Sequence, residues 1–155
     1  MHHWLMKSEP DVYGLDRLKA EGTTGWDGIR NYQARNFMRD TMQVGDKVLF
    51  YHSNSKPPGI AGTAVVSKLH LVDPTQFDPA SPYYDPKSSP DNPRWEMVEL
   101  RYESHFKHYL PLGDLRAEAP LKDMLLLKKG MRLSIQPVTA AEFKHILKLG
   151  QKGIH

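Results

Sequence analysis

Half of the prolines in this 155-residue chain stand within residues 73–94, and this segment constrains the fold most. Six of the twelve prolines fall there, with no helix or strand periodicity between them. The flanking residues 59–71 and 95–103 have the β-branched and alternating patterns of strands. We therefore predict two strands joined by a long irregular loop, which in a compact domain is usually functional. Because its Tyr83 and Tyr84 need apolar cover, we expect the loop to form one wall of a pocket.

The other predicted elements do not alternate regularly between strand and helix. Periodicity and capping signals predict strands at residues 2–7, 47–52 and 132–135, helices at 15–21, 31–42 and 139–149, and short helical stretches at 112–117 and 121–124. The strand at 47–52 is apolar on both faces, so it should be central in its sheet. Irregular alternation disfavours a doubly wound sheet. We predict one α/β (α+β) domain over residues 1–155, a curved mixed sheet or pseudo-barrel flanked by short helices.

Composition excludes several classes of function. The chain has no cysteine, so it contains neither disulfides nor thiolate catalysis nor cysteine-ligated zinc. Its eight histidines show no metal-binding spacing, and we expect neither a metal nor a cofactor. No apolar run approaches the roughly 18 residues of a membrane span, and no signal-peptide layout is present. We expect a cytoplasmic monomer without membrane contact, and the net charge of +3 mildly favours a polyanionic partner.

Residues 25–36 (GWDGIRNYQARN) combine an aromatic ring, hydrogen-bonding groups and positive charge. Trp26 stands in a glycine-flanked turn, and its ring either fills the core or offers a face to a ligand. Asn31 is a good N-cap for the following helix, and Tyr32 lies at that helix's start. Stacking, edge hydrogen bonds and cations together are the chemistry that holds a nucleobase attached to a phosphate. Trp95, at the start of a strand, is better explained as a core residue, with a place in the pocket as the alternative.

Polar residues follow two predicted strands. Lys7, Ser8 and Glu9 end the first strand, and His52 and Ser53 end the strand at 47–52. If these strands are neighbours, both polar ends converge on one pocket, where Ser8 and Glu9 could bind a ring edge and Lys7 a phosphate. Helix capping is an equally simple explanation for the first group.

Arginines of the 31–42 region are candidates for phosphate contacts. Arg30 and Arg35 stand beside a helix N-terminus, whose dipole also favours an anion. The alternative is a solvated helix face, which is the commoner role of such charges.

Sequence signatures of catalysis are missing, since the chain has no nucleophile elbow, no Gly-rich phosphate loop and no metalloprotease motif. We therefore expect a binding module with no catalytic residues. The rival interpretation is an enzyme acting on a nucleotide or small ligand, with Glu9 or His52 as acid–base. A small-molecule sensor that uses the same pocket is a third.

Several sequence blocks resemble, in order, those of the EVE domain family. They are residues 4–10 (WLMKSEP), 26–36 (WDGIRNYQARN), 51–54 (YHSN), 84–87 (YDPK), 93–95 (PRW) and 132–138 (RLSIQPV). The resemblance covers about residues 2–149. It implies a PUA-like fold, related to the YTH and ASCH domains, with a pocket for a base flipped out of DNA or RNA. EVE domains fused to other modules are associated with reading modified cytosine in DNA, and YTH domains with reading N6-methyladenosine in RNA.

A Lys-Ser pair and a following Trp also occur in YTH domains, so the resemblance assigns pocket roles to Lys7, Ser8 and Trp26. Candidates for further aromatic walls are Tyr32, Tyr84 and Trp95. The predicted function is therefore recognition of a modified nucleobase. The residues predicted to bind the base are Ser8, Glu9, Trp26, Asn31, Tyr32, His52, Ser53, Tyr84 and Trp95, and those predicted to bind phosphate are Lys7, Arg30 and Arg35.

Overall fold

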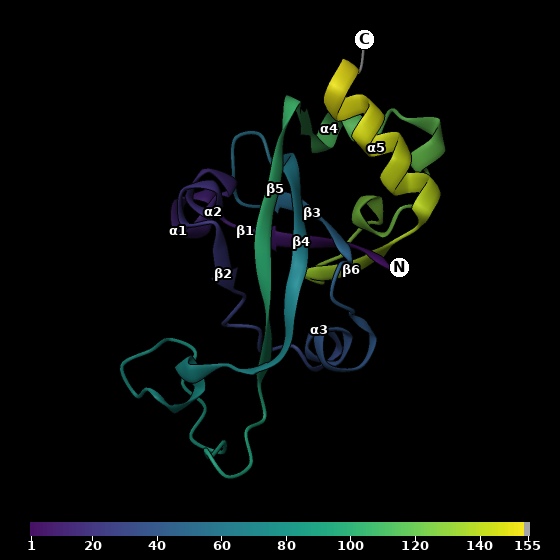
Figure 1. The fold of residues 1–155 in the computed structure, drawn as a ribbon. Helices are drawn as coiled ribbons and strands as arrows, with labels where there is room; N and C mark the ends of the chain where they lie inside the picture. The colour runs from purple at the N-terminus through teal and green to yellow at the C-terminus, as the bar shows by residue number, and fades with distance from the viewer. Residues whose placement is uncertain (154–155) are drawn as a thin grey trace.

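A computed structural model describes residues 1–153 and contains one six-stranded sheet (Figure 1). Its strands are β1 (His3–Ser8), β2 (Thr23–Gly25), β3 (Lys47–His52), β4 (Gly59–Val72), β5 (Glu96–Pro111) and β6 (Ile135–Val138). The strand order is β2-β5-β4-β3-β1-β6. The pair β1–β3 is parallel, and all other neighbouring strands are antiparallel. The predicted curved mixed sheet is confirmed, and β3 is central as expected.

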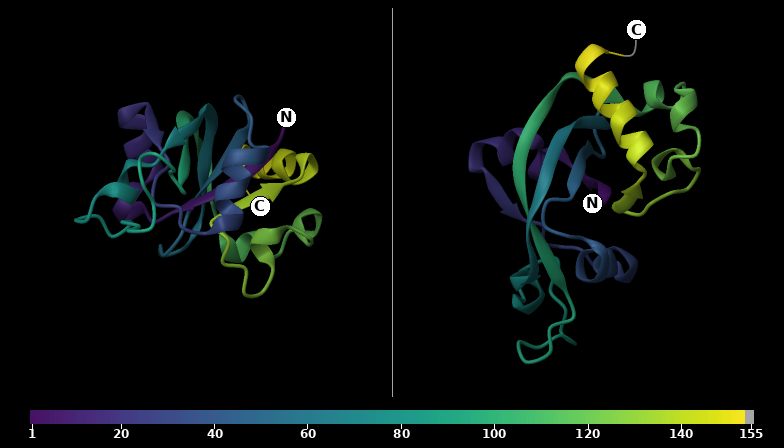
Figure 2. Two further views of the ribbon diagram at one scale, coloured as in Figure 1. Left: turned by 90° about the horizontal axis from the view of Figure 1, so that it is seen from below. Right: turned by 45° about the vertical axis from the view of Figure 1, so that its right-hand side comes forward.

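Short helices surround this sheet. They are α1 (Pro10–Tyr13), α2 (Leu15–Glu21), α3 (Tyr32–Asn36), the π-helical turn η1 (Phe37–Thr41), α4 (Leu112–Leu115), α5 (Ala140–Lys152) and the 3₁₀ turns η2 (Pro74–Phe77), η3 (Ala119–Leu121) and η4 (Leu125–Leu127). Helices α1 and α2 lie on one side of the long β4–β5 pair, and α4 and α5 lie on the other (Figures 1 and 2). None of the helices within residues 1–153 has the length and apolar character needed to cross a bilayer.

Two prolines explain where the predicted boundaries differ from the structure. Pro10 ends β1, as expected, but it also occupies the first turn of α1, where a missing N–H costs nothing. The last strand is β6, shifted toward the C-terminus from the predicted 132–135. Pro137 is tolerated inside it because β6 is an edge strand. The short strand β2 was not predicted, and β5 extends well past residue 103 because it pairs along the length of β4.

The sheet separates two hydrophobic cores. The first core packs α2, α3 and η1 against the sheet and contains Trp4, Trp26 and Phe50. The second core packs α4, η3, η4 and α5 against the other part of the sheet and contains Leu110 and Phe143. Helix α5 begins with the predicted capping box at Thr139. The first core therefore underlies the N-terminal elements, and the second anchors the C-terminal half.

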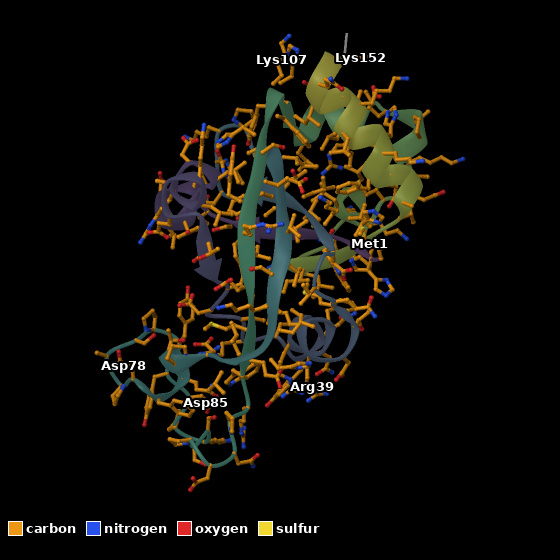
Figure 3. All side chains as sticks on the ribbon, in the orientation of Figure 1. Met1, Arg39, Asp78, Asp85, Lys107 and Lys152 are labelled. Atoms are coloured by element: carbon orange, nitrogen blue, oxygen red, sulfur yellow. The ribbon has the colours of Figure 1, made fainter. Side chains whose placement is uncertain are left out.

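The proline-rich loop extends from the end of the β4–β5 pair, where Asp78 and Asp85 mark it in Figure 3. Its base is ordered by Gln76, which is fully buried. The Gln76 amide nitrogen donates to the carbonyl oxygens of Asp73 (2.6 Å) and Trp95 (2.9 Å), and its amide oxygen accepts from the Ser88 hydroxyl (2.6 Å). One side chain thus ties the entry of the loop to its exit.

Candidate functional site

An open cleft of about 1330 Å³ lies where the N-terminal elements meet the long loop. Its walls come from the end of β1, from α1 and α2, from β2 and the turn after it, from the residues after β3, and from the segment before β6. The lining residues on which the argument depends are Lys7, Ser8, Glu9, Arg17, Glu21, Trp26, Asp27, Gly28, Ser53, Asn54, Tyr83 and Arg132.

The polar ends of β1 and β3 converge on this cleft, as predicted. The two strands are parallel neighbours with Ser8 opposite His52, and the Ser53 amide donates to the Ser8 carbonyl oxygen (3.0 Å). The Asn54 side chain donates to the Glu9 carboxylate (3.2 Å). The Ser8 hydroxyl donates to the Tyr13 carbonyl oxygen (2.6 Å), which leaves its lone pairs available to a ligand.

Trp26 lines the cleft, but the expectation that it is partly exposed is wrong. Its side chain is only 7% exposed, and its ring packs edge-to-face on Phe50 with centroids 5.5 Å apart. Its amide donates to the Val98 carbonyl oxygen (2.8 Å). The ring was expected either to fill the core or to offer a face to a ligand. Trp26 is a core residue, and its remaining surface faces the cleft.

Arg30 is a structural clamp, which contradicts its predicted role as a phosphate ligand. Its guanidinium makes five hydrogen bonds, to the carbonyl oxygens of Ile29 and Tyr83, to the Asp73 carboxylate and to the Thr75 hydroxyl. A guanidinium has five N–H donors, so none remains for a phosphate. The Asp73 partner is fully buried and also accepts from the Gly28 amide (2.8 Å). This network fastens the long loop to the Trp26 turn.

Four further predicted site residues lie outside the cleft, and three of them form a stack. The Trp95 ring is 5% exposed and lies against Tyr32, with centroids 4.9 Å apart. The guanidinium of Arg35 covers Tyr32 at 4.6 Å from its centroid and donates to the Arg94 carbonyl oxygen. Asn31 caps α3 by accepting from the Ala34 amide (3.0 Å). The prediction that Trp95, Tyr32 and Asn31 bind the base within the cleft is therefore corrected. These residues have structural roles, and Arg35 lies beside them.

His52 and Tyr84 are also absent from the cleft wall. The His52 ring nitrogen Nε2 accepts the Leu15 amide (3.1 Å) and so holds the start of α2. Burial lowers the pKa of His52. His52 lies on the same face of the sheet as Phe50 and Ser8, but its ring is engaged by the start of α2, and only Ser53 and Asn54, after the strand, reach the cleft. From the loop, Tyr83 rather than Tyr84 forms part of the wall.

Charged groups of both signs face the cleft. Burial lowers the pKa of Lys7, with no carboxylate to oppose it. Burial raises the pKa of Asp27, the negative charge of Asp73 raises it further, and Arg30 only partly offsets these effects. The Glu21 carboxylate accepts from Tyr13 (2.6 Å) and from Arg17 (3.2 Å). The arrangement suits a ligand that offers both donors and an anion.

Sequence reasoning missed Asp27, Arg17 and Arg132 as cleft residues. Asp27 belongs to the block at residues 26–36, and Arg132 begins the block at residues 132–138. Both blocks carry the family resemblance, so this resemblance could have identified the two residues. Arg17 comes from a short amphipathic helix with no such signal. Within residues 1–153, no group of three or more His, Asp or Glu side chains could hold a metal ion.

Gly28→Ala is predicted to displace Tyr83 from the cleft wall and to destabilise the fold. Gly28 has φ +77°, and a Cβ there would lie 2.8 Å from the Tyr83 ring. Gly130 is a matched control because it has φ +75° but nothing within 4 Å. Both variants should lose roughly 1 kcal/mol from backbone strain, and Gly28→Ala should lose more. Equal losses in denaturant unfolding would show that the Tyr83 contact contributes nothing.

Comparisons with known proteins agree with this architecture. The sequence model for the EVE domain matches residues 2–149. Thymocyte nuclear protein 1 of Danio rerio is 48% identical over 165 residues, which cover 94% of this chain and 71% of that protein. A structure of a hypothetical protein from Leishmania major aligns with TM-score 0.93 at 44% identity, covering 100% of this chain and 98% of that one.

A further structure is that of the human THYN1 protein in complex with 5-methylcytosine-containing DNA. It aligns with TM-score 0.90 at 44% identity and covers 97% of this chain and 98% of that chain. The match of the family model over nearly the whole chain, with relatives 44–48% identical along almost the same length, shows that this chain belongs to the EVE domain family.

Proposed function

We propose that this protein is a DNA-binding module that takes a modified base, of the 5-methylcytosine class, into the cleft beside Trp26. The observation that supports it most lies at the ends of two parallel neighbouring strands. There, an aromatic residue and polar groups with free hydrogen-bonding capacity meet in one cleft. The human THYN1 protein, 44% identical, has been crystallised with DNA that contains 5-methylcytosine.

In this proposal each part of the cleft has a physical task. The small part of Trp26 that is not buried in the core borders one side of the base, and the Tyr83 wall of the loop limits the other. Hydroxyl, amide and carboxylate groups of Ser8, Asn54 and Asp27 can pair with the base edge. A base taken out of the stack in this way exposes its edge to such groups. Lys7 also belongs to the cleft lining, and a contact with the attached phosphate requires its ammonium, which lies 5.8 Å from the centroid of the Tyr51 ring, to turn toward the cleft.

The geometry gives little support to the rival enzyme. Glu9 is exposed and bonded to Asn54, while His52 lies outside the cleft and accepts a backbone amide. These two side chains therefore do not form an acid–base pair around one ligand. We propose binding without turnover, and incubation of the protein with modified and plain oligonucleotides, followed by mass spectrometry, tests it. Chemical change that Glu9→Gln abolishes would support the enzyme.

The direct test is binding of duplexes that differ in a single base. We expect fluorescence anisotropy to show tighter binding to DNA with one 5-methylcytosine than to the same DNA with cytosine. Binding should also weaken steeply as salt rises, because phosphate contacts release counterions. Equal affinity for both duplexes at every salt concentration would contradict recognition of the modified base.

Lys7→Met is predicted to reduce the slope of log affinity against log salt by about one unit. Lys7 belongs to the lining of the cleft, whereas Lys144, exposed on α5, is a matched control that should leave the slope unchanged when replaced by Met. The same substitution at both sites removes one charge and keeps an unbranched side chain. An identical slope in wild type and Lys7→Met would exclude Lys7 from the phosphate contacts.

A further inference from the structure

Asp27 occupies a fixed position beside the surface on which the base is proposed to lie. It follows Trp26 directly and lines the same cleft. The backbone on both sides is held, since the Trp26 amide donates to Val98 and the Gly28 amide to the Asp73 carboxylate (both 2.8 Å). The Asp27 amide itself donates to the Gly25 carbonyl oxygen (3.0 Å). The carboxylate therefore starts from a rigid turn rather than a mobile loop.

The Asp27 carboxylate lacks the partners that its neighbours have. Of the three carboxylates that line the cleft, Glu9 accepts from Asn54, and Glu21 accepts from Tyr13 and Arg17. Arg30, the nearby cation, uses its donors on Asp73, Thr75 and backbone oxygens. Among residues 1–153, no other residue donates a hydrogen bond to this carboxylate. The side chain is exposed in the cleft, so its lone pairs are open to a donor that a ligand brings.

We propose that the Asp27 carboxylate accepts a hydrogen bond from the exocyclic amino group of the bound base and thereby selects 5-methylcytosine against thymine. This inference rests on the proposed function and adds the residue that reads the base edge. The Trp26 ring and the apolar parts of the cleft cannot supply this distinction, because stacking on an aromatic ring tolerates any base.

5-Methylcytosine and thymine are difficult for a binding site to distinguish by shape. Both carry a methyl group at position 5 of the same ring, so shape and stacking are nearly equal. At position 4, 5-methylcytosine has an amino group that donates to a carboxylate, whereas thymine has an oxygen that a carboxylate repels. A site built around a hydrogen bond rejects an analogue that lacks the donor because its own polar group is left unpaired.

The experiment places 5-methylcytosine or thymine opposite an abasic site in otherwise identical duplexes, so that neither base is held by a pairing partner. Dissociation constants are measured for wild type, Asp27→Asn and the control Glu21→Gln. Wild type should prefer 5-methylcytosine by roughly tenfold or more, as expected for a hydrogen bond to a charged group. In Asp27→Asn the ratio should fall toward one, because an amide can rotate to donate to the thymine oxygen. Glu21→Gln should keep the wild-type ratio.

Each outcome has a definite meaning. Asp27→Asn removes a charge that is repelled by Asp73, so the variant is expected to fold at least as well as wild type, and a thermal melt checks this. Binding by wild type with no preference, an unchanged ratio in Asp27→Asn, or loss of the preference in Glu21→Gln instead would overturn the role of Asp27. In all these cases the DNA-binding function stands. Absence of binding to any duplex by wild type would reject the proposed function itself.

Discussion

Asp73→Asn is expected to lower the free energy of unfolding by about 3 kcal/mol, the cost of breaking a buried ion pair by removing one partner. The carboxylate is fully buried, lies 3.0 Å from the Arg30 guanidinium and also accepts from the Gly28 and Thr75 amides (2.8 Å each). An amide cannot accept from all of these donors or balance the charge. Urea unfolding gives the free energy, and Asp91→Asn, exposed in the same loop, is the matched control.

The same carboxylate should make wild-type stability depend on acid. Burial alone would raise the pKa of Asp73, but hydrogen bonds from Thr75, Gly28 and Arg30 outweigh it and lower the pKa. The stabilisation is therefore complete above the ordinary carboxyl pKa and is lost as the pH falls through the lower, folded value. The difference in stability between wild type and Asp73→Asn should shrink over that acidic range. A difference that stays constant down to strong acid would contradict the charged clamp.

Trp26→Ala is expected to cost about 3–5 kcal/mol of stability, as for other large aromatic residues removed from a core. The ring is 7% exposed and packs on Phe50, so its removal leaves a cavity beneath the cleft. The variant should also bind DNA with 5-methylcytosine more weakly, by about 1–3 kcal/mol for one stacked base. Both quantities are measured at low temperature, where circular dichroism shows whether the variant remains folded.

Leu110→Ala separates the two effects of removing Trp26. Leu110 is fully buried in the second core, on the other side of the sheet from the cleft, and its truncation should cost about 2–5 kcal/mol. Its affinity for DNA per folded molecule should equal that of wild type. If Leu110→Ala weakens binding as much as Trp26→Ala does, the loss reflects general destabilisation and not the stacking surface.

Local patterns were sufficient to predict most elements and part of the cleft. Residues 47–52, apolar on both faces, identified a central strand, and the capping box at Thr139 marked the start of α5. The polar groups after β1 and β3 were placed together correctly once these strands were assumed to be neighbours. In each case the signal lies within a few residues of the feature that it predicts.

The incorrect assignments depended on contacts that the local sequence does not encode. Whether Arg30 meets a phosphate or a carboxylate is decided by Asp73, which stands far along the chain. The rings of Tyr32 and Trp95 stack on each other, and this contact keeps both outside the cleft. Asp27 was missed for the converse reason, since the role proposed for it depends on the lack of a partner for its carboxylate among residues 1–153. Charge and aromaticity were visible in the sequence, but the contacts that use them were not.

The position of β1 has a consequence for how this protein folds during synthesis. β1 is synthesised before the other five strands, yet it lies between β3 and β6, and His3 pairs with Val138 of the last strand. The Lys7 amide likewise donates to the carbonyl oxygen of Ser134 (2.9 Å), a residue of the cleft. Contacts of such long sequence separation slow folding because a large loop must close before they form. A nascent chain that ends before β6 leaves one edge of β1 unpaired, so binding competence should arise only after β6 has been synthesised.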